Sequence, residues 1–174
     1  FVGIEPLPIR HSLTVGEILA WIAERDGLPL GADGALAVVP VEGWDRARTA
    51  SAWDRPFVFP SPNMPTVDTA VVYPGGCLVE GTNLSEGRGT TAPFQLVGAP
   101  FLDGHAWAAA LAETQPAGLR LRPIVFRPTF HKFGGQACGG VQLHVTDAAA
   151  FRPYRTGVAL IAAARKLGGD AFRW

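Results

Sequence analysis

Residues 80–90 carry the greatest density of groups that could do chemistry. These eleven residues contain two carboxylates (Glu80 and Glu86), one amide, the guanidinium of Arg88 and three hydroxyls, with three glycines and one apolar side chain. A guanidinium is a planar fork that suits a carboxylate or a phosphate, and glycine lets backbone amides approach a ligand closely. The segment therefore predicts a ligand-binding loop, or alternatively a structural loop in which Arg88 pairs with Glu80 or Glu86.

Other chemistry-bearing residues are scattered. The histidines have no paired spacing on one helix, so no metal site is expected; they are His11, His105, His131 and His144. Neither a phosphate-binding P-loop nor a Gly-x-Ser-x-Gly elbow occurs, and no cofactor is expected. His131 and Lys132 lie in a turn rich in phenylalanine and glycine and could line a pocket, although each is more often a surface residue.

The two cysteines do not decide the compartment. Cys77 and Cys138 are too few for a disulfide scaffold and lack a zinc-ligand spacing. One bridge between them and two buried free thiols both remain open.

The composition indicates a folded, loop-rich domain. Of 174 residues, 48% are hydrophobic, and 21 glycines and 15 prolines exceed the usual share. Fifteen basic residues balance fifteen acidic ones, which argues against nucleic-acid binding, and no apolar run is long enough to span a membrane. The chain begins at Phe1 and its single methionine is Met64, so we expect it to be part of a longer polypeptide.

Helical spacing predicts three helices. Thr14 and Glu17 form a capping box that begins the first helix, and Gly27 ends it. Further helices are expected over residues 103–114 and 153–167. In the last of these, the residues expected to face inward are Val158, Ile161 and Leu167.

Four segments resemble strands: residues 35–41, 69–73, 120–126 and 141–145. Three prolines make residues 60–65 a rigid, extended loop. The nearby aromatic residues Trp44, Trp53 and Phe57 are expected to be core or platform residues. Because helices and strands do not alternate regularly, the fold class is expected to be α+β, one compact domain over residues 1–174 with a mixed sheet that could close toward a barrel.

Several ordered motifs strongly resemble the NamZ-type exo-β-N-acetylmuramidase family. They run the length of the chain and comprise residues 1–3, 13–17, 57–65, 73–90, 98–100 and 138–141. The resemblance implies a C-terminal domain, the active site lying in a cleft between it and a Rossmann-like N-terminal domain of the same polypeptide. It also implies removal of N-acetylmuramic acid from the non-reducing ends of peptidoglycan fragments, and a bacterial periplasmic or secreted location. The family's Pro-Glu-His-Gly motif is missing here, so the isolated domain is expected to be inactive.

The loop chemistry then assigns roles to individual residues. Glu80 and Glu86 are the catalytic candidates. Glycoside hydrolysis usually needs two carboxyl groups, of which Glu80 or Glu86 could supply one and the missing domain the other. Arg88 suits the lactyl carboxylate of muramic acid. The complete set of substrate-binding candidates is Asn63, Thr82, Asn83, Arg88 and Thr90. The alternatives are a non-catalytic carbohydrate-binding or cell-wall-interaction module, and a structural domain whose loop only closes the interface with its neighbour.

Overall fold

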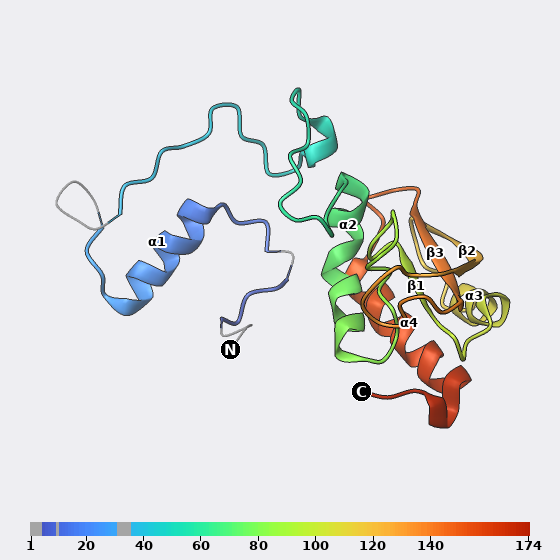
Figure 1. Ribbon diagram of the computed structural model, residues 1–174. Helices are drawn as coiled ribbons and strands as arrows, with labels where there is room; N and C mark the ends of the chain where they lie inside the picture. Colours follow the sequence, from blue (N-terminus) through green and yellow to red (C-terminus); the bar gives the residue numbers. More distant parts are fainter. Residues whose placement is uncertain (1–4, 10, 31–35) are drawn as a thin grey trace. The chain divides into compact units, whose positions relative to one another are not determined.

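A computed structural model describes residues 5–9, 11–30 and 36–174 (Figure 1). It divides the chain into two compact units, Phe1–Asp54 and Arg55–Trp174. We describe each unit by itself and call them the first and second units. Residues 1–3, which contribute to the family resemblance, lie outside the described residues.

The first unit contains the predicted capped helix. Helix α1 spans Val15–Asp26, and the Thr14 side chain accepts from the backbone N–H of Glu17 while the Glu17 carboxylate accepts from that of Thr14. Gly27 ends the helix at φ 66°, a left-handed conformation that glycine adopts at little cost. The predicted start and end of this helix are confirmed.

The remainder of the first unit differs from the prediction. Residues 36–41 form no strand, and Val39 is 90% exposed; Ala35, where the predicted strand begins, lies outside the described residues. Trp44 and Trp53 are exposed rather than core residues, and the short 3-10 helix η1 covers Ala50–Ala52. An apolar run favours a strand only where a second strand and a packing surface meet it, which local sequence does not specify.

Acidification is expected to weaken the start of α1. Hydrogen bonds from Arg46 and from the backbone of Thr14 lower the pKa of Glu17 from 4.5 to about 2. Because the folded-state pKa lies below the unfolded one, this contact stabilises the first unit above about pH 4.5, and its contribution is lost as the pH falls toward 2. The pair is exposed and will be screened by salt.

An NMR titration of the Glu17 carboxyl carbon measures this effect. Arg46→Met should raise the midpoint toward 4.5, the ordinary value. Arg48→Met is the matched control, because the Arg48 guanidinium donates to the carbonyl of Ala52 instead. A wild-type midpoint near 4.5 would contradict the prediction.

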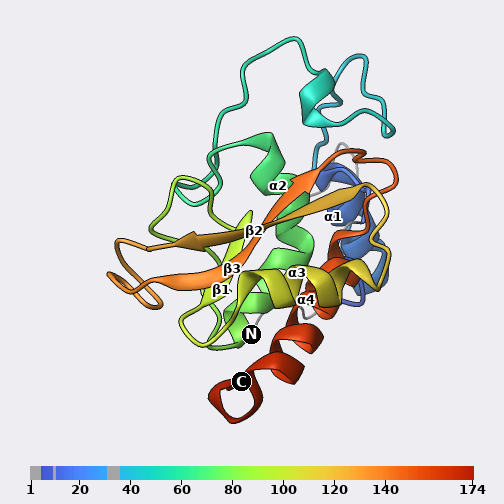
Figure 2. The ribbon, with the colours of Figure 1, turned by 90° about the vertical axis from the view of Figure 1, so that its right-hand side faces the viewer.

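An antiparallel sheet organises the second unit. Its strands are β1 (Leu96–Ala99), β2 (Leu119–Phe126) and β3 (Cys138–Val145), in the order β1-β3-β2. Figure 2 shows β2 and β3 running side by side across the unit. The strands predicted over 120–126 and 141–145 are confirmed, and the α+β class with them. The expected mixed, barrel-like sheet is wrong, since the sheet is open and every strand pair is antiparallel.

Helices α2 (Val67–Gly76), α3 (Gly104–Ala112) and α4 (Pro153–Gly168) accompany this sheet, with short 3-10 helices η2 (Cys77–Gly81) and η3 (Gly169–Ala171). Asp103 caps α3 by accepting from Ala106 N–H. The helices predicted over 103–114 and 153–167 are therefore confirmed. Within α4, Ile161 is buried as predicted, but Val158 and Leu167 are exposed.

Helix α2 replaces the strand predicted over 69–73. Thr66 caps it, its side chain accepting from the backbone N–H of Thr69. Pro74 lies in the last turn of the helix, and the helix packs beside α4 (Figure 1). β-branched residues favour strands only weakly, so a good cap and a packing partner override that preference. Before α2, residues 60–65 form a loop as predicted, but the loop is not extended throughout, since Met64 N–H donates to Ser61 O and closes a turn. Phe57 is half-buried.

The two faces of the sheet differ. The helices cover the face that presents Val97, Val141 and Leu143, where the buried Trp107 donates its Nε1–H to the carbonyl of Leu160. A smaller cluster of Leu96, Phe126 and Cys138 occupies the other face, with Phe133 against it. The sheet and its helices thus form a rigid support for the connections between them.

Both cysteines are free thiols. Burial raises the pKa of Cys77, with a further contribution from the charge of Glu80, and burial also raises the pKa of Cys138. The sequence left open a disulfide between Cys77 and Cys138 or two free thiols, and the structure contains the two free thiols.

Candidate functional site

The 80–90 segment connects η2 to β1 and is tied firmly to its own unit. Ser85 and Gly98 exchange backbone hydrogen bonds of 2.8 and 3.0 Å, so the loop pairs with β1. Gly87 and Gly89 have φ of 78° and 81°. A Cβ on Gly89 would lie 2.8 Å from the backbone of Phe130. These glycines therefore let the loop approach its own chain, not only a ligand.

The Glu86 carboxylate lies at the centre of a charged cluster. Its side chain is 1% exposed, and its Oε1 lies 3.0 Å from Arg88 Nε and 3.2 Å from His131 Nδ1. Its Oε2 lies 3.2 Å from Lys132 Nζ. Arg88 also pairs with Glu80 through Nη2. We call these five residues, Glu80, Glu86, Arg88, His131 and Lys132, the Glu86 cluster.

The contacts around Glu86 are close but poorly aligned. Both of its carboxylate oxygens and Arg88 Nε are buried without a hydrogen-bond partner of good geometry among the described residues. Lys132 Nζ makes aligned bonds of 3.3 Å instead, to the carbonyls of Val79 and Glu80. The buried carboxylate is thus held by charge at short range, with hydrogen-bonding capacity left over.

Aromatic rings border the cluster on one side. The Arg88 guanidinium lies 5.2 Å from the ring centroid of Phe94, and Tyr73 meets the same ring edge-on at 4.8 Å. Burial lowers the pKa of Arg88, but the paired carboxylates of Glu80 and Glu86 outweigh it and leave the pKa raised. Burial raises the pKa of Tyr73, reinforced by the charge of Glu80.

The structure brings together only part of the predicted site. Glu80, Glu86 and Arg88 are neighbours, and the Arg88 pairing is the one that the structural alternative predicted. Asn63 is half-buried in the 60–65 loop, where its backbone N–H donates to Ser61 Oγ.

The other three candidates use their side chains within the fold. Thr82 Oγ1 donates to the carbonyl of Val79, and Thr90 Oγ1 to that of Gly87. Asn83 donates to Ala171 O at 2.9 Å and accepts from Arg173 N–H at 2.8 Å. Asn83 therefore holds the C-terminal segment against the loop.

His131 and Lys132 belong to the site, although the sequence suggested them only as possible pocket-lining residues and not as catalytic or substrate-binding candidates. Their signal was present, since both lie in a turn rich in glycine and aromatic residues. Local sequence could not show that this turn lies against the 80–90 loop. Thr129 makes that contact, donating from its backbone N–H and from Oγ1 to Gly89 O at 2.9 Å each.

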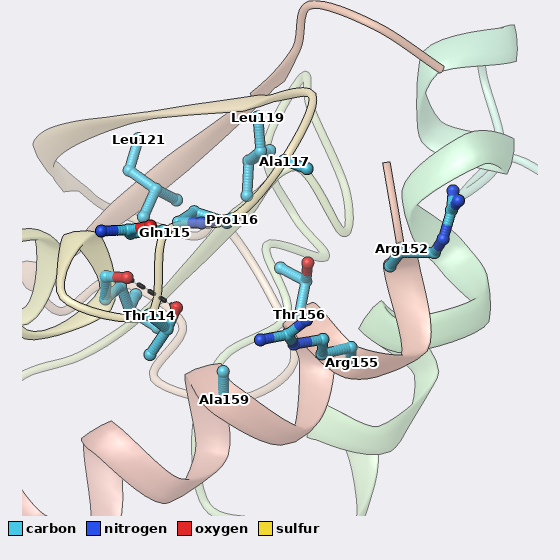
Figure 3. Close-up of a pocket in the computed structure, with 11 residues that line it drawn as sticks. Thr114, Gln115, Pro116, Ala117, Leu119, Leu121, Arg152, Arg155, Thr156 and Ala159 are labelled. Carbon is cyan, nitrogen blue, oxygen red and sulfur yellow. Dashed lines mark hydrogen bonds between the residues drawn. The ribbon is translucent and has the colours of Figure 1, made fainter. Parts of the chain in front are cut away.

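Two hollows in the second unit lie apart from the Glu86 cluster. One, of about 60 Å³, lies between the end of α3 and α4, where Thr114 and Pro116 face Thr156 and Ala159 (Figure 3). The other, of about 80 Å³, is lined in part by Asp68 and His144. Neither shares a residue with the cluster. Within the described ranges, no group of three or more His, Cys, Asp or Glu side chains is arranged to hold a metal ion.

Comparison with known proteins decides the family. The C-terminal model of the exo-β-N-acetylmuramidase NamZ matches residues 71–174, and the N-terminal model matches residues 1–68. The chain belongs to the NamZ family. The family resemblance inferred from the sequence is confirmed, and the chain carries a segment of the N-terminal model as well as one of the C-terminal model. The boundary between the two NamZ models falls within α2.

One curated NamZ relative and one solved structure extend the comparison. The chain is 41% identical over all 174 residues to the peptidoglycan β-N-acetylmuramidase NamZ of Bacillus subtilis strain 168, and spans 41% of that protein. A crystal structure of a DUF1343 family protein from Bacteroides fragilis NCTC 9343 superposes with a TM-score of 0.84 at 23% identity, over 92% of this chain and 42% of that one. The second likeness supports the fold alone.

None of the helices in the described part of the chain has the length and apolar character needed to cross a membrane.

Proposed function

We propose that this chain is part of a peptidoglycan glycoside hydrolase that removes N-acetylmuramic acid from non-reducing ends, and that it forms one wall of the substrate cleft. The observation that carries the proposal is the 41% identity over the whole chain to a protein named as a peptidoglycan β-N-acetylmuramidase. The remaining wall, and a second carboxyl group, would come from the Rossmann-like part of the same polypeptide.

The two catalytic candidates differ in exposure, and this difference suggests different roles for them. The Glu80 side chain is 38% exposed and could reach a sugar, whereas the Glu86 side chain is 1% exposed and cannot. We therefore assign Glu80 as the carboxylate on this side of the cleft and Glu86 as a positioning residue. Hydrolysis with two carboxyl groups then needs one further acid or base about 5–10 Å from Glu80.

Arg88 is the proposed anchor for the lactyl carboxylate. Its Nη2 and Nε face Glu80 and Glu86, while Nη1 has no hydrogen-bond partner among the described residues. Asn63, Thr82, Asn83 and Thr90 stay predicted sugar contacts, through whatever hydrogen-bonding capacity their structural bonds leave open.

Activity of two lengths of polypeptide tests the proposal. The full-length polypeptide that carries this chain should hydrolyse a chromogenic β-N-acetylmuramide, and residues 1–174 alone should do so about 100-fold more slowly or worse, because one catalytic carboxyl group would be missing. Near-equal turnover would show that residues 1–174 hold every catalytic group, and the proposal of a site divided between two parts of the polypeptide would be wrong. Binding without turnover by either protein would favour the alternative, a non-catalytic cell-wall-binding module.

Arg88→Lys in the full-length polypeptide tests the anchor. Loss of the free Nη1 donor group should weaken binding of N-acetylmuramic acid about tenfold or more, with little change for N-acetylglucosamine, which lacks the lactyl group. Arg120→Lys, on an exposed position of β2, is the matched control. If both ligands weaken together, or if only thermal stability falls, Arg88 is structural.

A further inference from the structure

His131 has a left-handed backbone conformation. Its φ is 66°, which non-glycine residues rarely adopt, and such strain persists only where the surroundings maintain it. Here the turn is closed by hydrogen bonds from Gly134 N–H to His131 O (3.2 Å) and from Gly135 N–H to Pro128 O (2.7 Å). The turn thus places the His131 imidazole beside the Glu86 carboxylate.

The buried carboxylate lies close to one nitrogen of this imidazole. Glu86 Oε1 is 3.2 Å from His131 Nδ1, a contact too poorly aligned to count as a hydrogen bond. A negative charge beside Nδ1 still favours, among the two neutral tautomers, the one with its proton on Nδ1, and this tautomer leaves Nε2 as an acceptor. The His131 side chain is 48% exposed, and its Nε2 has no partner among the described residues. The cluster therefore presents one oriented acceptor at its surface.

Arg88 and His131 are side by side, because Arg88 Nε and His131 Nδ1 contact the same carboxylate oxygen. The Arg88 guanidinium, which can donate hydrogen bonds to an anion, thus lies next to the His131 imidazole, which can accept one from a hydroxyl. A site for an anion alone would not need the second group. N-acetylmuramic acid presents the matching groups on adjacent ring carbons, with the lactyl carboxylate on O3 and a hydroxyl on C4.

We propose that His131 Nε2 accepts a hydrogen bond from the 4-hydroxyl of an N-acetylmuramic acid residue whose lactyl carboxylate lies against Arg88. This inference rests on the proposed function and gives a reason why hydrolysis would be confined to the non-reducing ends of glycan strands. Within a glycan strand O4 carries the next sugar, so only a non-reducing end has a free 4-hydroxyl. Glu86 is then a positioning residue that selects the tautomer of His131.

Paired ligands in the full-length polypeptide test this contact. Methyl β-N-acetylmuramide and its 4-deoxy analogue are titrated by calorimetry into wild type, His131→Leu, His131→Gln and the control His105→Gln, which alters an exposed residue on α3. We expect wild type and the control to prefer the 4-hydroxyl ligand by about 3- to 10-fold. His131→Leu should bind both ligands equally, and His131→Gln, which keeps an acceptor oxygen, should recover part of the preference.

A preference that survives in His131→Leu overturns the proposal while leaving the proposed function intact. If wild type binds neither ligand, and the full-length polypeptide does not hydrolyse a β-N-acetylmuramide, the proposed function fails and the contact with it.

The tautomer is measured separately, in residues 1–174 without ligand. Long-range ¹H–¹⁵N spectra should show His131 protonated on Nδ1 in wild type and a mixture of tautomers in Glu86→Gln. A wild-type His131 protonated on Nε2 would contradict the positioning role of Glu86, whatever the activity assays show.

Discussion

Replacing Gly75 or Gly157 with alanine is expected to destabilise the second unit by about 3 kcal/mol or more, because a methyl group at either position would collide with backbone. A Cβ on Gly75 would lie 1.8 Å from Pro153 O, and a Cβ on Gly157 would lie 2.2 Å from Gly75 O. Neither neighbour can rotate away, so α2 and α4 would have to separate. Alanine's better helix propensity, about 1 kcal/mol, offsets only part of this cost.

Urea unfolding of residues 1–174 measures this difference, with Gly81→Ala as the control. A Cβ on Gly81 would have nothing within 4 Å, so this variant should stay within about 0.5 kcal/mol of wild type. If Gly75→Ala unfolds with the same midpoint as Gly81→Ala, the two helices are not packed through their glycines.

Glu86→Ala should be the second severe substitution, costing about 3–5 kcal/mol of stability. The buried carboxylate neutralises two cations at close range, and its removal leaves Arg88 with Glu80 alone and Lys132 with backbone carbonyls only. Since a domain of this kind has about 5–15 kcal/mol in total, the variant would be close to unfolding at 37 °C.

A double variant separates lost charge balance from lost packing. Lys132→Met combined with Glu86→Gln removes a cation along with the buried charge, and should be less destabilised than the sum of the two single variants. Glu113→Gln, at an exposed position beyond α3, is the control and should change stability little. Additive losses from the two single variants would show that Glu86 and Lys132 are not coupled.

The candidate site could be predicted from local residue types only in part. The residue types at 80–90 predict a site and leave two possibilities for Arg88, and three of those residues, Glu80, Glu86 and Arg88, do meet in the Glu86 cluster. The side chains of Thr82 and Asn83 are predicted sugar contacts because their polar groups suit hydroxyls. Those same groups suit backbone, and the fold uses them to close a turn and to hold the C-terminal segment.

Features with local causes can be predicted from the sequence alone. The capping box of Thr14 and Glu17, the stop at Gly27 and the strand over residues 141–145 depend on a few neighbouring residues and were predicted from them. Whether residues 69–73 form a strand or a helix depends on distant parts of the chain, because packing against α4 outweighs a weak β preference. The contact between His131 and Glu86 likewise joins residues that are far apart in the sequence. It depends on the hydrogen bonds from Thr129 to Gly89 O, which hold the 129–135 turn against the 80–90 loop.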